Sequence, residues 1–108
     1  MPEITLGEFE QLVLLALVRL GAEAYGVPIC QDIVDRTGRD VSLGAVYKTL
    51  DRLETKGLIV SRVGAPTPER GGRRKKHYRL LVTGQRALRQ SIGGIRRMTD
   101  GLEPELEL

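Results

Sequence analysis

The chain has 108 residues, of which 41% are hydrophobic and 29% charged, as expected for one globular domain with a modest core. A single cysteine excludes an internal disulfide framework, and one cysteine with one histidine excludes a zinc site of the usual Cys/His kind. The apolar run at 12–18 is too short to span a bilayer, and the acids before it are unlike a signal peptide. We therefore expect a soluble cytoplasmic protein. No motif indicates a catalytic site, a cofactor or a metal, so an enzyme is not expected.

Positive charge is concentrated in one part of the chain, although the formal net charge is only +3. Residues 1–61 contain six Lys or Arg and nine acids, whereas residues 62–97 contain eleven Lys or Arg and one acid, Glu69. Residues 98–108 contain four acids and no Lys or Arg. Such a basic segment favours a polyanionic partner.

The first predicted helix begins at Thr5-Leu6-Gly7-Glu8, which fits a capping box, and runs to about Leu20, where Gly21 stops it. It is apolar almost all round from Leu12 to Val18, and such a helix is covered on most faces. Two interpretations are open. The helix is either the central core helix of a monomer or is covered on its second face by another subunit.

Two further helices are predicted before residue 57. One runs from about Tyr25-Gly26 to Thr37-Gly38, and Ser42 then caps a helix from Leu43 to Lys56. This third helix has an apolar face, formed by Leu43, Val46, Leu50 and Leu53. The opposite face is expected to point outward and consists of Ala45, Lys48, Thr49, Arg52 and Lys56.

The next segment predicts an antiparallel hairpin with strands at 58–63 and 76–82. Strand alternation turns Tyr78 inward and His77 outward with Arg79. The connecting loop carries a dense group of cations around two glycines: Arg70, Arg73, Arg74, Lys75 and Lys76. Like charges this close favour binding to phosphates, and a solvated charge run is the alternative.

Thr83 is expected to cap a last helix, from about Gly84 to Thr99, with an apolar stripe of Leu88, Ile92, Ile95 and Met98. Gly93-Gly94 costs about 1 kcal/mol per glycine relative to alanine and is expected to kink or end this helix. The acidic tail from Gly101 is expected to fray.

The order of elements predicts a mainly α fold with a small antiparallel β hairpin, the layout of a winged helix-turn-helix. Several segments together resemble the PadR-like transcriptional regulators over about residues 5–92. They are Leu12 to Leu20, Ala24-Tyr25-Gly26, Ser42 to Tyr47, Leu50 to Leu53 with Glu54, Lys56-Gly57-Leu58, Arg70 to Arg73, and Tyr78-Arg79-Leu80 with Thr83 and Gly84. The resemblance implies a homodimeric DNA-binding protein, usually a repressor, whose first and C-terminal helices build the dimer.

We accordingly expect a winged-helix DNA-binding domain at 1–82, a dimerisation helix at 83–100 and the acidic tail at 101–108. Expected DNA contacts come from the third helix (Ser42, Ala45, Tyr47, Lys48, Thr49 and Arg52), the loop (Arg70, Gly71, Gly72, Arg73, Arg74, Lys75 and Lys76) and the start of the second helix (Tyr25 and Gly26). Expected dimer contacts are Leu12, Leu15, Leu88, Ile92 and Ile95.

Alternatives accompany these expectations. Tyr25 and Tyr47 either contact phosphates or fill the edge of the core. Cys30 is expected to be a buried small hydrophobe, with a redox switch as the alternative. The expected partners are double-stranded DNA and a second copy, and a dimer cleft can admit a small-molecule effector that the sequence does not identify. A non-catalytic interaction module or a non-specific nucleic-acid binder is the alternative function.

Overall fold

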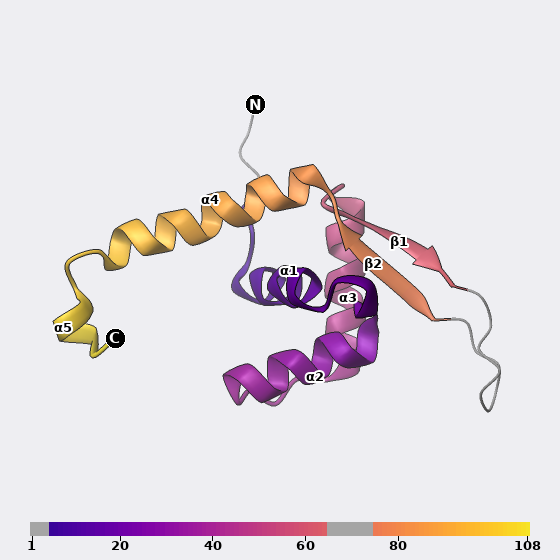
Figure 1. Cartoon of the computed structure of the whole chain (residues 1–108), viewed down its shortest axis with the longest axis horizontal. Helices are drawn as coiled ribbons and strands as arrows, with labels where there is room; N and C mark the ends of the chain where they lie inside the picture. The colour runs from indigo at the N-terminus through magenta and orange to yellow at the C-terminus, as the bar shows by residue number, and fades with distance from the viewer. Residues whose placement is uncertain (1–4, 65–74) are drawn as a thin grey trace.

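Three helices, a two-stranded hairpin and a long helix follow one another along the chain (Figure 1). The computed structural model describes residues 5–64 and 75–108. The elements are α1 (Glu8–Leu20), the 3-10 helix η1 (Gly21–Glu23), α2 (Gly26–Thr37), α3 (Leu43–Thr55), β1 (Ile59–Val63), β2 (Lys76–Leu80), α4 (Val82–Thr99) and α5 (Glu103–Leu106). Within these described residues, no helix is long and apolar enough to cross a membrane.

The start of α1 differs from the expected capping box. The helix begins at Glu8 rather than near Thr5, and the Glu10 carboxylate accepts a hydrogen bond from the backbone N–H of Gly7 at 2.8 Å. Glu10 is also bound by the Lys56 ammonium, with Nζ 2.8 Å from Oε2. Lys56, which we expected on the outward face of the third helix, is therefore turned toward α1.

Burial and ion pairing act in opposite directions on Glu10, whose side chain is almost fully enclosed. Burial by itself raises the pKa of this carboxyl, because it disfavours the charged form. Hydrogen bonds from Lys56 and Gly7, together with the charges of Lys56 and Arg52, outweigh that effect and hold the pKa below its usual range. The pair joins the N-terminal end of α1 to the C-terminal end of α3.

The core lies where α1 packs against α2, α3 and β2. Its largest fully enclosed side chains include Leu14 from α1, Ile29 from α2, and Leu50 and Leu53 from α3. The remaining face of α1 is only partly covered, because Leu12 and Leu15 are half-buried and Val18 is exposed. Packing within the chain thus buries one face of α1 and leaves the other only partly covered.

The predicted hairpin is confirmed, with a register that runs from Ile59 opposite Leu80 to Val63 opposite Lys76. Tyr25 adds an isolated antiparallel bridge to β2 at His77, and the backbone N–H of Tyr78 donates to the Ala24 carbonyl at 2.9 Å. These contacts attach β2 to the segment just before α2.

A side chain of α3 also holds the hairpin in place. Glu54 Oε2 accepts from the backbone N–H of Ser61 at 3.1 Å and from its hydroxyl at 2.6 Å. Tyr78, the partner of Ser61 in the hairpin register, is buried, as expected. Its burial, with the nearby carboxylates of Asp51 and Glu54, raises the pKa of its phenol to about 12.

The last long helix departs from expectation in two ways. It passes through Gly93-Gly94 without a break, so the predicted kink or end is wrong. Its N-cap is Leu81, and Thr83 instead donates its hydroxyl to the Gly57 carbonyl at 2.5 Å. The cost of two glycines, about 1 kcal/mol each, is not enough to interrupt a helix of 18 residues.

Helix α4 packs on its own chain through Gly84, Ala87 and Leu88, which are buried, and through Ile92, which is half-buried against the core. The rest of the helix extends away from the body, and the tail lies at the end of the molecule farthest from the hairpin (Figure 1). The acidic tail was expected to fray, but it forms the short helix α5, with Pro104 in its first turn where a missing N–H is tolerated.

Candidate nucleic-acid interface

Helix α3 presents two cations to solvent, as predicted. Ser42 is its N-cap, and its hydroxyl accepts a hydrogen bond from the backbone N–H of Ala45 at 3.1 Å. Lys48 and Arg52 are exposed one turn apart, and Ala45 is half-buried beside them. The exposed Asp51 lies between the two cations in sequence and adds a hydrogen-bond acceptor to this surface.

The expectation that Thr49 faces outward is wrong, because its side chain is only 4% exposed. On a helical projection Thr49 lies about 40° from Leu53, which is fully buried. Leu43, which we assigned to the core face, is half exposed at the other edge of that arc. The buried face of α3 is therefore rotated toward Thr49, and a base contact by this hydroxyl is not available in this conformation.

Tyr47 connects α3 to the start of α2. Its ring lies directly on Gly26, where an added Cβ would stand 2.7 Å from Cε1 of the ring and closer still to its hydroxyl. Tyr47 remains 41% exposed, and its hydroxyl lies at Gly26, the first residue of α2. Glycine at 26 is explained by this close approach. Backbone N–H groups at a helix N-terminus favour an anion.

Residues at the end of the hairpin loop also contact the N-terminal end of α2, through Tyr25. The Lys75 ammonium donates to the Tyr25 hydroxyl at 3.2 Å and lies 4.5 Å from the centre of its ring. The His77 ring packs edge-on against Tyr25, with 5.3 Å between ring centres. His77 does share the outer strand face with Arg79, but it is half-buried by these contacts. Sequence alone did not show this, because Tyr25 is distant along the chain.

Seven residues of the hairpin loop were predicted to contact DNA, and two of them lie in the described part of the chain. Lys75 is half-buried against Tyr25, and Lys76 is exposed, with its ammonium 5.8 Å from the centre of the Tyr78 ring. The other five, Arg70, Gly71, Gly72, Arg73 and Arg74, lie outside the described residues. The structure thus brings together Tyr25, Gly26, Tyr47 and Lys75.

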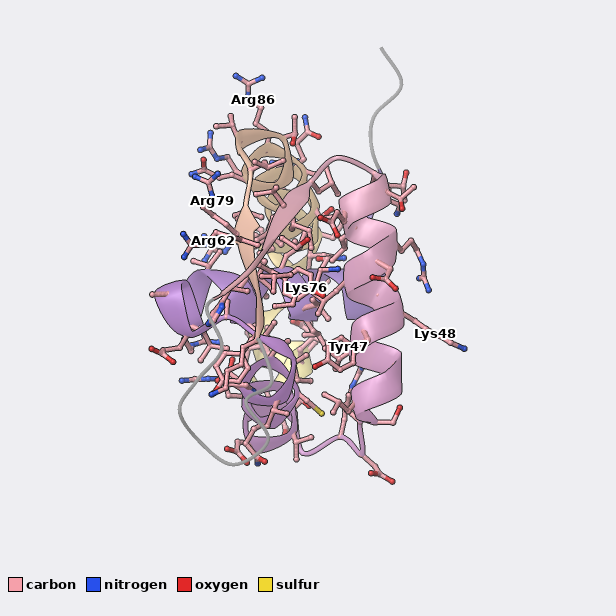
Figure 2. All side chains as sticks on the ribbon, turned by 90° about the vertical axis from the view of Figure 1, so that its right-hand side faces the viewer. Tyr47, Lys48, Arg62, Lys76, Arg79 and Arg86 are labelled. Atoms are coloured by element: carbon pink, nitrogen blue, oxygen red, sulfur yellow. The ribbon has the colours of Figure 1, made fainter. Side chains whose placement is uncertain are left out.

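Exposed cations of the basic segment 62–97 lie on a different side of the molecule from Lys48 of α3. Figure 2 shows Arg62, Arg79 and Arg86 on one side of the molecule and Lys48 on the opposite side. Lys48 therefore points away from the arginines of the hairpin's outer face (Figure 2). The sequence did not show this division, because a count of charges along the chain does not tell which way each side chain points.

The expected dimer residues fall into two groups. Leu88 is buried in its own chain, so its assignment to a surface contact is wrong. Leu12, Leu15 and Ile92 are half-buried, and Ile95 is 60% exposed. These four still have apolar surface available to a partner.

Cys30 is half-buried rather than fully buried, and its thiol donates to the Val41 carbonyl at 3.4 Å. Among residues 5–64 and 75–108, no three His, Cys, Asp or Glu side chains come close enough to hold a metal ion. The groups that the described residues offer for binding are exposed cations, tyrosines and a helix N-terminus.

Solved structures share this architecture. A PadR family transcriptional regulator from Eggerthella lenta is 30% identical, with a TM-score of 0.67 and coverage of 93% of this chain and 87% of that one. A PadR family transcription regulator from Clostridium difficile is 23% identical, with a TM-score of 0.68 and coverage of 94% and 100%. A PadR-like regulator from Bacillus cereus is 22% identical, with a TM-score of 0.64 and coverage of 87% and 89%. No curated protein matches the chain.

The family model described as the transcriptional regulator PadR-like family matches residues 14–90. This range contains all of α2, α3 and the hairpin, and about half of α1 and of α4. Because the match covers more than half of the sequence and agrees with the Eggerthella lenta structure, the predicted family is confirmed. The chain belongs to the PadR-like family of transcriptional regulators.

Proposed function

We propose that this protein is a repressor that binds a pseudo-palindromic operator as a homodimer, with α3 in the major groove. The observation that carries the proposal is the exposed pair Lys48 and Arg52 on a capped helix that also carries Tyr47, whose ring lies on Gly26. Tyr25, the residue before Gly26, binds Lys75. An α-helix fits the major groove, which is about 12 Å wide.

Each part of this surface has a distinct role in the proposal. Lys48 and Arg52 donate to base edges, with guanine the preferred partner of such side chains, while Asp51 can accept from the amino group of cytosine. The hydroxyl of Tyr47 and the N-terminal end of α2 bind a phosphate. Lys75, Lys76 and the loop cations neutralise further phosphates. Thr49 has no part in base reading.

Apolar surface that the single chain leaves open supports the proposed homodimer. Ile95 and Met98 are 60% and 75% exposed on the projecting half of α4, and Val18 is exposed on the uncovered face of α1. We infer that the stripe on α4 covers this face of α1 in a second copy. A two-fold dimer of this kind predicts two half-sites about one helical turn of DNA apart.

The DNA test uses an operator found by genome-wide mapping of bound DNA and measures affinity by fluorescence anisotropy over a series of salt concentrations. Lys48→Ala and Arg52→Ala should each weaken specific binding by about 1–3 kcal/mol and relax sequence preference. Lys76→Ala should weaken all duplexes alike and reduce the salt slope by about 1. Arg86→Ala removes the same charge on the opposite side and serves as the matched control (Figure 2).

Two results would contradict the proposal. If Arg86→Ala weakened binding as much as Arg52→Ala, α3 would not be the reading element. If affinity for the mapped site equalled that for unrelated duplexes at one salt concentration, the protein would be a non-specific binder instead. Transcription from the mapped promoter, with and without the protein, distinguishes repression from activation. A small-molecule effector stays a prediction.

A further inference from the structure

A groove of about 930 Å³ opens on the outer face of the hairpin, bordered by the C-terminal end of α1 and η1. Its apolar lining includes Leu17 and Val18 from the helix and Val60 and Leu80 from the strands. Val18 and Val60 are exposed, so the groove presents apolar surface that nothing in the described chain covers.

Two guanidinium groups line the same groove, those of Arg62 and Arg79. Both residues are exposed, and neither forms an ion pair with any carboxylate in residues 5–64 and 75–108. His77 also lines the groove, and its buried Nδ1 has no hydrogen-bond partner in the part of the chain described. An occupant that combines apolar groups with carboxylates would cover the exposed apolar side chains and pair with both guanidinium groups.

The tail carries that combination. Asp100, Glu103, Glu105 and Glu107 are exposed together with Leu102, Leu106 and Leu108. Within the described residues, none of the four carboxylates has an ion-pair partner. Exposed leucines are unfavourable in water, so a partner surface that covers them would stabilise this segment.

The tail cannot reach the groove of its own chain. Helix α4 has 18 residues and so extends about 27 Å. It runs away from the hairpin and leaves the tail at the opposite end of the molecule (Figure 1). A second copy can bring its tail to this groove, because Val18 belongs both to the groove and to the face of α1 on which the partner's α4 is proposed to pack.

We propose that the acidic tail of each protomer docks in the hairpin groove of its partner, with its carboxylates on Arg62 and Arg79 and its leucines on Val18 and Val60. This inference rests on the homodimer proposed above. It also gives a role to Arg62 and Arg79, which lie on the side of the molecule opposite Lys48 (Figure 2). The charge pattern of the sequence, basic at 62–97 and acidic beyond, is then complementary between subunits.

Charge reversal tests the contact through the dimer dissociation constant, measured by sedimentation at low salt. Arg62→Glu with Arg79→Glu should raise this constant about tenfold, and Glu103→Arg with Glu105→Arg should do the same. The four changes together should return it to within about twofold of the original value. The effect should diminish in 0.5 M salt, because the contacts are exposed to solvent.

A matched control compares Arg79→Glu with Arg86→Glu, which introduces the same charge on the same side of the molecule outside the groove lining. The dissociation constant should rise about threefold in the first variant and less than twofold in the second. Circular dichroism and thermal unfolding confirm that both variants fold.

The identity of the docked segment is tested by cross-linking in the otherwise unchanged chain. Arg62→Lys places an amine in the groove, and a carbodiimide joins amines to carboxylates that touch them. In a mixture of light-isotope and heavy-isotope chains, we expect mixed-isotope peptides that link position 62 to the tail.

Each outcome decides the inference. Mixed-isotope links together with rescue by the four changes support it. A stable dimer without these links, or without any effect of charge reversal, overturns tail docking and leaves the homodimer intact. Links found only within single chains also overturn it. A chain that stays monomeric at all concentrations overturns both the docking and the proposed dimer.

Discussion

Gly84 lies where the first turn of α4 meets the start of the hairpin. Its substitution is the most direct test of how α4 packs on the hairpin. A Cβ at this position would overlap the Leu58 carbonyl oxygen and would stand 2.7 Å from Cδ1 of Leu80. A carbon needs about 3.3 Å from a carbonyl oxygen, so Gly84→Ala requires α4 to move away by about 1 Å.

That movement would weaken two hydrogen bonds that attach α4 to the turn before β1. The backbone N–H of Leu81 donates to the Leu58 carbonyl at 3.0 Å, and the Thr83 hydroxyl donates to the Gly57 carbonyl at 2.5 Å. Each contributes about 1 kcal/mol, while alanine offsets up to about 1 kcal/mol through its higher helix propensity. With the cost of overpacking included, we expect Gly84→Ala to lower the free energy of unfolding by about 2 kcal/mol.

Urea denaturation at fixed protein concentration measures this change, and thermal unfolding should show a midpoint about 8–16 °C lower. The matched control is Gly44→Ala, also in the first turn of a helix, where an added Cβ meets nothing within 4 Å. That variant should be more stable by about 0.5–1 kcal/mol. If Gly84→Ala proved as stable as Gly44→Ala, the close packing of α4 on the turn before β1 would be refuted.

Three further predictions concern the site, the ion pair and the dimer. Gly26→Ala should push the Tyr47 ring aside, which lowers the affinity for every DNA duplex several-fold, as fluorescence anisotropy would show. Urea unfolding should show little loss of stability. An unchanged DNA affinity would mean that the Tyr47 ring does not take part in phosphate binding. Because the pKa of Glu10 is lowered in the folded chain, its bond to Lys56 stabilises the fold above the unfolded pKa of about 4.3 and is lost as pH falls through the folded value. Glu10→Gln should therefore cost about 1.5 kcal/mol at pH 7 and less at pH 3, and an equal cost at both pH values in urea titrations would disprove this linkage. Ile95→Glu should raise the dimer dissociation constant at least tenfold in sedimentation experiments, and an unaltered constant would remove α4 from the interface.

Local sequence signals determined most of the elements. Ser42 caps α3 as predicted, Gly38 ends α2 with a positive φ of 70°, and the alternation around Tyr78 placed the hairpin and its inward face correctly. These features depend on residues within one turn or one strand, where capping and side-chain alternation act directly. The family was likewise readable from the joint pattern of motifs.

Tertiary contacts decided the points that the sequence left open or misassigned. Packing against neighbouring helices rotated the buried face of α3 so that Thr49 is enclosed, which a count of apolar residues on one helix cannot reveal. Ion pairing turned Lys56 toward Glu10, and Tyr25 met Lys75 across a long stretch of chain.

The distribution of charge was likewise determined partly by the sequence and partly by the tertiary structure. Composition established that residues 62–97 are basic and that the tail is acidic. Only the fold put Lys48 on one side of the molecule and Arg62, Arg79 and Arg86 on the other (Figure 2). The physical reason is that net charge adds along a chain regardless of position, whereas the direction of each side chain is set by which face of its helix or strand the core covers.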